Sequence, residues 1–508
     1  MNILFVNPPQ TVPVTERCLN IKFPLGLMYM ADTLEKNGFT LKILDCPLHY
    51  RIRRSLNAQL DKIGLLPEQI KKTIEDFRPD IIGVSCAYSP YECDSFDIIN
   101  YIKPLFRHIF IVVGGAHSSA NPEYVLRNLN IDAVVIGEGE EVMLDIARRI
   151  RDHLSLNDTP GIALRTDNGV RVNERRGYIA DLDTVKPAWH LLDMQQYFNH
   201  PYNANATMRC NTVDIVTSRG CPGHCVFCSI HTVWGRKWRA RSPLNVVDEM
   251  EMLMTRYGAR QIRIQDDNLT LDKRRIMAIC DEIVKRKLDI RWDTPNGVAI
   301  GTLDKETLLK MKTSGCYRIT FGIESGCKRI QRYIGKVLDL TRVNELMLCC
   351  HRVGMWVCAT FIIGFPDETR EEIRETENYI LTCPVNFPFI YVAQPLKGTD
   401  LCHDFEKHNL KPAEFIETSS IMQTKYNTLH LTSTELNRIH SRLYKAFVVR
   451  KALSYLNPRK FYREMLSKIR SWEDVAYVLH MFLELLNFMI PATLVYRVGK
   501  IWKHGNRR

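Results

Sequence analysis

The sequence has little cysteine and no segment of biased composition. Its 16 cysteines in 508 residues fall far below the roughly 8–10% typical of disulfide-rich secreted domains. The opening residues, MNILFVNPP, show neither the charged stretch nor the small-residue cleavage site of a signal peptide, so we expect a cytoplasmic protein. With 45% hydrophobic and 25% charged residues, the chain has enough apolar material for two to four globular domains.

Excess positive charge is almost absent from the body of the chain. The net charge is +12, but residues 438–508 alone carry 15 lysines and arginines against four acidic residues, or +11. A basic groove for nucleic acid would need that charge spread over a folded domain. We therefore expect no nucleic-acid partner, and a specialised basic, helical C-terminal region over residues 431–508.

The first 151 residues predict an α/β domain with a doubly wound, Rossmann-like parallel sheet. Five short, nearly continuous apolar runs alternate with helical patterns, which is typical of strands buried on both faces. Small or turn residues follow several of these runs, where the backbone would approach a ligand at the carboxyl edge of the sheet. The alternative, that they only form tight strand-to-helix turns, stays open. The runs are residues 3–7, 41–45, 81–86, 109–115 and 133–137, and the edge residues are Asn7, Pro8, Ser85, Gly114, Gly115, Gly137, Glu138 and Gly139.

A second α/β alternation follows a connecting segment. Residues 152–205 contain turn signals and a hairpin pattern around Asp167-Asn168-Gly169, which indicates a linker with a hairpin. Residues 206–430 then hold six strand patterns separated by helical stretches, which predicts a partial (β/α)6 barrel with function at the carboxyl ends of its strands. The six strand patterns are residues 214–220, 261–268, 291–298, 317–325, 357–366 and 389–396.

Three cysteines form a motif directly after the first of these strands. Cys221, Cys225 and Cys228 have the spacing C-x3-C-x2-C in a Gly/Pro-rich loop, which can turn all three sulfurs toward one point. Such a set holds a metal or a metal cluster. With His224 or His231 it could complete a zinc site, whereas a four-iron, four-sulfur cluster on three thiolates keeps one iron open for a substrate group. The position at the mouth of a barrel favours the iron–sulfur cluster.

This motif, with an aromatic residue before its last cysteine, resembles the radical S-adenosylmethionine (SAM) superfamily. The resemblance implies a partial βα barrel, a [4Fe-4S] cluster on the three cysteines, and S-adenosyl-L-methionine chelated by the open iron and cleaved to a 5′-deoxyadenosyl radical. It also implies cofactor contacts at three other strand ends. These are Asp266, Asp267 and Asn268 in QDDN, Glu324 and Ser325 in GIES, and Ile363, Gly364 and Pro366 in FIIGFPDET.

The first half of the chain resembles the cobalamin-binding domain fused to many radical SAM enzymes. The matching stretches are NPP after the first strand, PLGLMYMADTLEKNGF, GGAHSSANPEYVL and VVIGEGE. The resemblance implies cobalamin at the carboxyl edge of the sheet, where His117 could line the pocket or could simply begin a helix. The pattern D-x-H-x-x-G is absent, because Asp45 and His49 have the wrong spacing and no glycine follows. The lower axial ligand of the cobalt is therefore unassigned.

Together these resemblances imply an enzyme, a cobalamin-dependent radical SAM methyltransferase. It would methylate an unactivated carbon of a small or apolar substrate, with an electron donor such as flavodoxin or ferredoxin. One alternative is radical oxidative cyclisation, as in the anaerobic tetrapyrrole ring cyclase. The other is a non-catalytic, zinc-stapled cobalamin sensor.

An apolar run in the basic C-terminal region suggests contact with a membrane surface. Residues 475–496 are long enough to span a bilayer, but His480, Glu484, Asn487 and Pro491 interrupt them. Flanking lysines and arginines suit anionic lipid. We therefore expect a cytoplasmic protein with peripheral contact at the inner membrane face and a lipid or tetrapyrrole substrate. The alternative is a helical cap that packs on the barrel and turns its charge to water.

Overall fold

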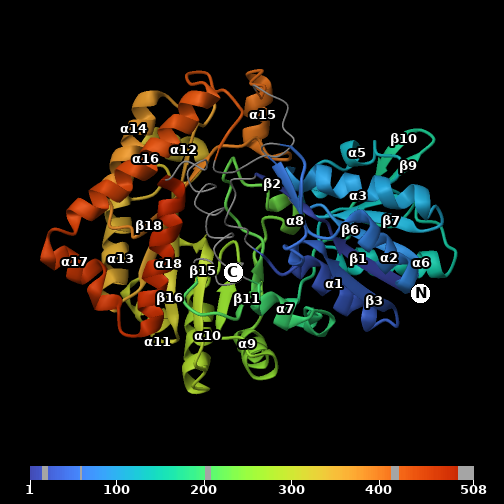
Figure 1. The fold of residues 1–508 in the computed structure, drawn as a ribbon, viewed down its shortest axis with the longest axis horizontal. Helices are drawn as coiled ribbons and strands as arrows, with labels where there is room; N and C mark the ends of the chain where they lie inside the picture. The colour runs from blue at the N-terminus through green and yellow to red at the C-terminus, as the bar shows by residue number, and fades with distance from the viewer. Residues whose placement is uncertain (14–20, 58–59, 88, 201–206, 413–422, 490–508) are drawn as a thin grey trace, which may run out of the picture.

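The computed structural model describes residues 1–13, 21–57, 60–87, 89–200, 207–412 and 423–489. Two α/β units lie side by side, the N-terminal one in blue to cyan and the second in green to orange (Figure 1). The C-terminal helices pack on the second unit (Figure 1). This arrangement confirms the predicted fold class.

The N-terminal unit is built on a seven-stranded sheet in the order β10-β9-β8-β7-β6-β1-β3. Five neighbouring strands of this sheet are parallel and occur where the apolar runs predicted them; they are β8, β7, β6, β1 and β3. Successive residues of β1 reach opposite faces, because Phe5 packs in the core with α1 and α6 while Val6 packs in the core with α2 and α3. The elements are β1 (Asn2–Asn7), β3 (Thr40–Asp45), β6 (Ile81–Ser85), β7 (Phe110–Gly114), β8 (Ala133–Val135), α1 (Leu25–Glu35), α2 (Pro67–Phe77), α3 (Glu92–Leu105), α4 (Ala116–Ala120), α5 (Pro122–Val125) and α6 (Glu140–Arg151).

The predicted linker hairpin is part of this sheet. Strands β9 (Ile162–Thr166) and β10 (Gly169–Val172) pair with each other, and β9 adds antiparallel to β8. Ile162 and Ala163 are buried there on opposite faces of the sheet, so the hairpin packs as part of the first unit. A second, three-stranded sheet was not foreseen. It contains β2 (Gln10–Pro13), β5 (Leu60–Ile63) and β4 (Arg53–Ser55).

The second unit is the predicted half-open barrel of six parallel strands. Their order is β11-β14-β15-β16-β17-β18, so each strand pairs with the next along the chain. Helix caps mark the boundaries between them: Ser242 caps α9, and Thr369 forms a capping box with Glu372 at α14. The elements are β11 (Thr212–Ile215), β12 (Ser218–Arg219), α8 (His231–Trp234), β13 (Arg239–Ala240), α9 (Pro243–Tyr257), β14 (Gln261–Ile264), α10 (Lys273–Lys285), β15 (Arg291–Val298), α11 (Lys305–Thr313), β16 (Cys316–Glu324), α12 (Lys328–Ile334), α13 (Leu340–Val353), β17 (Trp356–Ile363), α14 (Arg370–Thr382), β18 (Phe387–Val392) and α15 (Asp400–Lys407).

Three C-terminal helices, α16 (Ser433–Ser454), α17 (Pro458–Glu464) and α18 (Trp472–Met489), pack on the barrel. Tyr477 and Met481 of α18 are buried in a cluster with Tyr317 and Trp356 of the barrel strands. The part of the predicted apolar run that the structure describes is therefore a cap on the barrel. Pro491 and the rest of the run lie outside the described residues. Within the described part of the chain, no helix is both long enough and apolar enough to cross a membrane.

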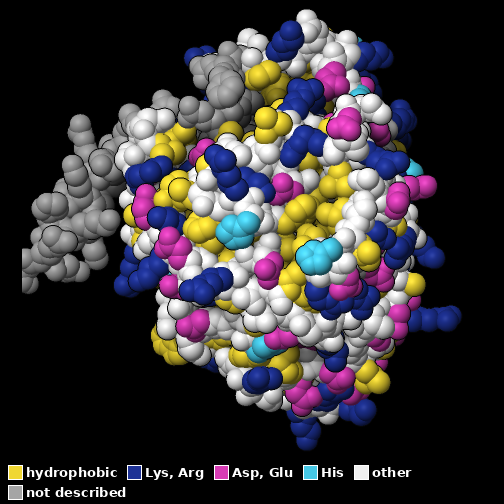
Figure 2. All heavy atoms as spheres, turned by 90° about the vertical axis from the view of Figure 1, so that its right-hand side faces the viewer, with side chains coloured by type: hydrophobic (Ala, Val, Ile, Leu, Met, Phe, Trp, Pro, Cys, Tyr) yellow, Lys and Arg dark blue, Asp and Glu magenta, His cyan; other side chains and the backbone are white. Residues whose placement is uncertain are grey.

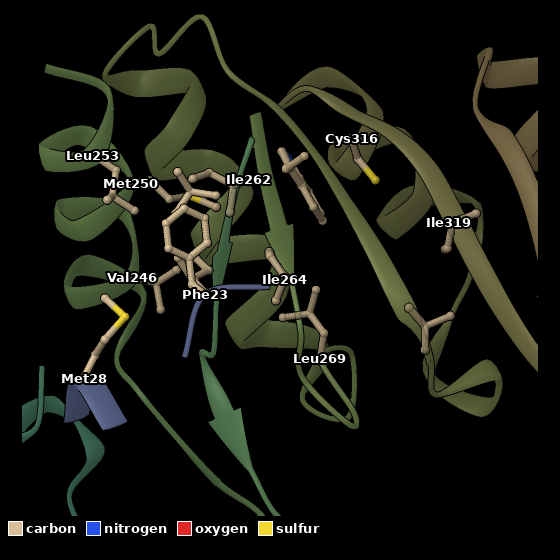
Figure 3. Packing of buried hydrophobic residues seen from close by; sticks show 14 of the residues in the cluster. Phe23, Met28, Val246, Met250, Leu253, Ile262, Ile264, Leu269, Cys316 and Ile319 are labelled. Carbon is tan, nitrogen blue, oxygen red and sulfur yellow. The ribbon is translucent and has the colours of Figure 1, made fainter. Parts of the chain in front are cut away.

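One hydrophobic core runs through both units. It joins residues of the first sheet, such as Ile3 and Phe5, to barrel residues such as Val213 and Ile262. Figure 3 shows Phe23 and Met28 of the N-terminal unit beside Val246 and Met250 of α9 and Ile262 and Ile264 of β14. Because the apolar contacts continue across the boundary, the two units form one packed body.

The outer face of the N-terminal unit carries charges of both signs. Figure 2 shows lysines and arginines interspersed with aspartates and glutamates over this face, around patches of hydrophobic side chains. No single-sign stripe dominates the view. The body of the chain is thus balanced on this face, as its composition suggested.

Candidate functional site

The three motif cysteines lie in the loop between β12 and β13. These two short strands pair antiparallel and bring the ends of residues 220–238 together. All three thiols are partly exposed and none forms a disulfide. A Cβ atom on Gly223 would lie 3.4 Å from Cys221 Sγ and 4.0 Å from Cys225 Sγ, so these two sulfurs flank one glycine. The loop therefore brings the sulfurs of Cys221 and Cys225 to the same side, as ligation of a shared cluster needs.

The protein environment keeps two of these thiols protonated. Burial raises the pKa of the Cys228 thiol to about 11, and the neighbouring Asp267 and motif cysteines add to the shift. Burial also raises the pKa of Cys225, although Lys336 opposes it. Thiolates in such surroundings need a bound cation to form. A metal centre bound by the loop would therefore have to deprotonate these cysteines as it binds.

The zinc alternative finds no ready site in the loop. The His231 ring lies against the backbone, with Nδ1 3.1 Å from the carbonyl oxygen of Cys228. In the parts of the chain that the structure describes, no three His, Cys, Asp or Glu side chains are placed to hold a single metal ion.

The QDDN segment follows β14, and its side chains have different environments. Asp266 is buried and accepts hydrogen bonds from Thr217 N (2.5 Å), Thr217 Oγ1 (2.6 Å) and Ser218 Oγ (2.6 Å). It therefore anchors the chain that leads into the cysteine loop. Asp267 has a buried Oδ2 without a hydrogen-bond partner, and burial raises its pKa to about 7. The Asn268 amide nitrogen lies 3.9 Å from Cys221 Sγ.

Asp267 is thus the carboxylate of this segment with an oxygen that is free to accept a hydrogen bond from a ligand. A buried oxygen without a partner costs free energy in the empty site. A bound ammonium group would donate to it and restore the charged form. This is the chemistry that the resemblance implies for the methionine amino group of SAM, and it favours Asp267 over Asp266 for that role.

Glu324, at the end of β16, belongs to a polar cluster beside the cysteines. Its Oε1 lies 3.0 Å from Lys336 Nζ, and its Oε2 accepts a hydrogen bond from Thr360 Oγ1 at 3.1 Å. Its backbone is left-handed, with a φ of 67°, a conformation that costs free energy in a non-glycine residue. Ser325 is fully buried and hydrogen-bonds Thr376. The structure brings Glu324 to the site together with Lys336, whereas Ser325 faces α14.

The segment after β17 forms a tight, buried turn. Ile363 lies in an apolar cluster with Val392 and Leu436, and Gly364 has a left-handed φ of 84°. The carboxylate of Glu368 accepts hydrogen bonds from Gly364 N (2.6 Å) and Phe365 N (3.2 Å). The carbonyl oxygen of Pro366 accepts one from Leu429 N at 3.0 Å. These contacts fix the backbone that the resemblance places next to adenine.

At the facing edge of the N-terminal sheet, β1 and β3 end in a buried polar network. Asn7 Nδ2 donates to Asp45 Oδ1 (2.7 Å), and the Tyr197 hydroxyl donates to Asp45 Oδ2 (2.5 Å). Burial raises the pKa of Asp45 to about 6. Pro8 is buried beside this network, and Ser85 ends β6 with its carbonyl oxygen bonded to Ser95 Oγ. These side chains and carbonyls are already engaged within the protein.

Gly115 has a structural reason to be glycine. Its φ is +124°, and a Cβ atom would lie 2.6 Å from the carbonyl oxygen of Cys86 and 2.8 Å from Ala87 Cα. The ends of β6 and β7 can approach only because that atom is missing. At Gly114 the nearest atom to a Cβ would be Val135 Cβ, at 3.7 Å. His117 is buried, with Nδ1 2.9 Å from Ser89 Oγ and Nε2 2.9 Å from Glu92.

The edge formed by Gly137, Glu138 and Gly139 contacts the barrel directly. Gly137 N donates to Ser119 Oγ at 3.0 Å, and Gly139 lies at the start of α6. Glu138 receives hydrogen bonds from Arg219 and Arg239, which begin and end the cysteine loop. In addition, α4 packs against α8, the short helix after Cys228. The carboxyl edges of the two sheets therefore meet at the cysteine loop.

Sequence reasoning missed several groups at this junction. Lys336, Arg219 and Arg239 belong to no motif, and the two arginines have a partner about 80–100 residues away, whereas Glu368 lies within FIIGFPDET but was not singled out there. The only signal was position: Arg219 stands two residues before Cys221, and Glu368 closes a predicted strand-to-helix turn.

Comparisons with known proteins agree with this geometry. The model of the Radical SAM superfamily matches residues 215–380, and that of the B12 binding domain matches residues 13–147. Cytidylyl-2-hydroxyethylphosphonate methyltransferase of Streptomyces wedmorensis is 31% identical over 439 residues, covering 79% of this chain and 81% of the relative. The chain belongs to the cobalamin-dependent radical SAM methyltransferase family. Its cofactors are accordingly a [4Fe-4S] cluster, SAM and cobalamin.

Other relatives of this radical SAM enzyme include a cyclase. The anaerobic magnesium-protoporphyrin IX monomethyl ester cyclase of Rubrivivax gelatinosus is 27% identical, covering 80% of this chain and 72% of the cyclase. Among solved structures, the radical SAM methyltransferase TsrM of Kitasatospora setae, with cobalamin and a [4Fe-4S] cluster bound, has a TM-score of 0.64 at 17% identity. The match covers 86% of this chain and 81% of TsrM. At that identity the likeness supports the fold.

Proposed function

We propose that this enzyme methylates an unactivated carbon of a small-molecule substrate at the junction of its two sheets. The observation that carries the proposal is the position of the cysteine loop. Its three thiols lie at the carboxyl edge of the barrel sheet, and its two ends contact Glu138 at the carboxyl edge of the cobalamin-type sheet. A radical generator and a methyl carrier held at these two edges would face one shared substrate space.

The residues of the chain hold and orient the reacting groups. When bound, the three cofactors supply a 5′-deoxyadenosyl radical for hydrogen removal and a methyl group for transfer. Cys221, Cys225 and Cys228 ligate the cluster. Asp267 Oδ2 accepts from an ammonium group, and Lys336, paired with Glu324, places a positive charge beside the cluster loop. The chemistry then takes place between two packed units that share one core.

Anaerobic incubation of reconstituted protein with cobalamin, reductant and SAM tests the proposal. Mass spectrometry is expected to detect both 5′-deoxyadenosine and S-adenosylhomocysteine, because one SAM molecule yields the radical and a second supplies the methyl group. Cys225→Ala should abolish 5′-deoxyadenosine formation. Cys210→Ala is the matched control, since Cys210 is exposed and lies outside the motif. Zinc in place of iron, with no SAM consumed, would contradict the proposal.

The same assay separates methylation from cyclisation. A radical cyclase of the tetrapyrrole type, favoured by the 27% identity to the Rubrivivax gelatinosus enzyme, would form 5′-deoxyadenosine without stoichiometric S-adenosylhomocysteine. For the electron donor we propose a flavodoxin or ferredoxin. For the substrate we propose an apolar molecule, a lipid or a tetrapyrrole.

A surface on the C-terminal helices supports an apolar substrate reached from a membrane. One face of α18 is buried through Tyr477 and Met481, while apolar residues on its other face are exposed: Trp472 (86%), Leu479 (55%) and Phe482 (51%). Arg459, Lys460 and Arg470 precede this helix in a segment that is strongly basic. Apolar side chains with nearby cations suit an anionic lipid surface. We therefore propose a cytoplasmic enzyme with peripheral contact at the inner membrane face.

A further inference from the structure

The cysteine loop is clamped at its base. Arg219 and Arg239 are register partners in the β12–β13 pair, and residues 220–238 with all three cysteines form the connection between them. Whatever fixes these two arginines therefore fixes both ends of the cluster loop. Their side chains are only 4% and 5% exposed.

Both arginines are held by the edge of the cobalamin-type sheet. Arg219 Nη1 donates to Glu138 Oε1 at 2.9 Å, and its Nη2 donates to Glu140 Oε1 at 2.6 Å. Arg239 Nη1 lies 3.0 Å from each oxygen of Glu138. The two glutamate side chains are 6% and 5% exposed. Two buried cations and two buried anions thus form one balanced network across the junction.

Aromatic rings complete the network. The Arg219 guanidinium lies 4.8 Å from the ring centre of Tyr29 in α1, and the Arg239 guanidinium lies 4.9 Å from that of Tyr178. Ile179 N donates to Glu138 Oε2 at 2.8 Å. Planar guanidinium groups held by two carboxylates and by ring faces have one geometry, which lysine does not reproduce. The network therefore sets the orientation of the loop, beyond the non-directional apolar contacts of the shared core.

We propose that Glu138, Arg219 and Arg239 are positioning residues that couple cluster binding to cobalamin binding. Cobalamin, bound at this carboxyl edge where the resemblance places it, would contact the segment that carries Glu138 and hold it in place. The network passes that restraint to the base of the cysteine loop, and a cluster in the loop restrains Glu138 in return. By linkage, each cofactor then raises the affinity of the protein for the other by the same factor. This inference rests on the proposed function, because it requires both cofactors.

Equilibrium binding of hydroxocobalamin to the full chain tests the coupling without any turnover. Affinity is measured anaerobically on cluster-loaded protein and on protein freed of iron by a chelator. The wild type is expected to bind cobalamin roughly tenfold more tightly when the cluster is present, a coupling in the usual range. The reciprocal readout is iron retained under chelator with and without cobalamin.

Glu138→Gln and Arg219→Lys are expected to reduce the coupling factor to below about twofold. Glu138→Gln keeps the shape but removes one charge, and Arg219→Lys keeps the charge but loses the paired donors. Arg209→Lys is the control, because Arg209 is a similarly buried arginine whose partners, Glu473 and Asp289, lie away from the junction. Arg209→Lys should leave the coupling factor unchanged, even where it lowers the melting temperature.

Three results would overturn the inference. One is a wild-type protein that binds cobalamin with the same affinity whether or not the cluster is present. Another is unchanged coupling in both variants. The third is loss of coupling in Arg209→Lys as well, which would trace it to general stability. Failure of the protein to bind cobalamin at all would overturn the proposed function together with the inference, whereas uncoupled binding of both cofactors overturns the inference alone.

Discussion

Glu368 is a buried carboxylate whose titration should be visible in the stability of the protein. Its side chain is 0% exposed, Oε2 accepts from two backbone amides, and Oε1 has no partner. Burial raises its pKa from 4.5 to about 8. Glu368→Gln keeps an oxygen acceptor for both backbone amides and removes the ionisable group. The pH dependence of the difference in unfolding free energy between the two proteins therefore measures the cost of ionising Glu368.

The magnitude follows from linkage. The folded state holds its proton up to about pH 8, while the unfolded state loses it near 4.5, so this group destabilises the fold as pH rises. The stabilisation that the protonated side chain provides is complete at a pH below the pKa of the unfolded state. It disappears as the pH rises through the pKa of the folded state. At about 1.4 kcal/mol per pH unit below pH 8, the wild type should lose roughly 2–3 kcal/mol from this source between pH 6 and pH 9.

Anaerobic thermal unfolding of both proteins across this pH range measures the difference. The melting temperature of Glu368→Gln minus that of the wild type should rise with pH by about 2–3 °C in total, because an unfolding entropy of about 2.1 cal/mol/K per residue makes 1 kcal/mol equal to about 1 °C for a packed body of 508 residues. Glu372→Gln is the control. Its pKa is lowered to about 2, chiefly by the hydrogen bond from Arg329, so its effect should be constant from pH 6 to pH 9.

A melting-temperature difference that stays flat with pH would refute this reasoning. It would mean that Glu368 is ionised in the folded protein at neutral pH, with a partner for Oε1. An ionised Glu368 carboxylate would then stabilise the turn after β17 through its hydrogen bonds from Gly364 N and Phe365 N. In that case Glu368→Gln should lower stability equally at every pH, as Glu372→Gln is expected to do.

The remaining predictions concern the cofactor edges and the surface. Asp267→Asn should lower SAM affinity at least tenfold in equilibrium binding with iron content unchanged, because a charge-assisted hydrogen bond contributes about 1.5–3 kcal/mol, whereas Asp266→Asn should lower iron content by releasing Thr217 and Ser218. Gly115→Ala should lower the melting temperature even without cobalamin, since its Cβ meets backbone; Gly114→Ala should keep the fold and lower only the cobalamin retained after gel filtration, and equal retention would remove the assignment of this edge. Full-length protein should float with anionic liposomes at low salt and not at high salt, and Leu479→Asn with Phe482→Asn should abolish flotation; failure of the wild type to float would contradict the membrane contact.

The fold was largely predictable because its strands are buried on both faces. Strands β1 and β6 of the first sheet and β17 of the barrel carry nearly continuous apolar runs, and turn residues separate such runs from the helices. Strand β16 is buried at every one of its positions. A strand with apolar residues on both faces must be covered on both faces. The apolar pattern alone therefore predicts that it lies inside a parallel sheet.

The small sheet and the placement of the hairpin were not predictable in the same way. Strand β4 is Arg53–Ser55, exposed at every residue, and its neighbour β5 has only Asp61 and Ile63 buried. Strands this short and polar carry no periodic signal. The hairpin β9–β10 had a clear turn signal, but its partner strand β8 is fixed by tertiary contact rather than by local sequence.

At the site, the motif identified the cluster cysteines but not the groups that support them. Spacing is a local property, so Cys221, Cys225 and Cys228 stand out in the sequence. Asp266 and Asp267 are adjacent and alike in sequence, yet one anchors the loop and the other has a free buried oxygen. That difference depends on which side of β14 faces Thr217, and no pattern in one chain reports it.

The barrel interior shows why the substrate remains beyond sequence reasoning. Asp214, Arg263, Asp293 and Arg318 are register partners on four successive strands, and they pair across the sheet: Arg263 Nε donates to Asp214 Oδ1 at 2.7 Å, and Arg318 Nε to Asp293 Oδ2 at 2.9 Å. All four are buried. In the sequence the same alternation of apolar and charged residues indicates a strand with one face in water. A barrel lumen and a solvent face therefore give the same pattern, so the chemistry of the lumen above this ladder, where a substrate would lie, is set by tertiary structure alone.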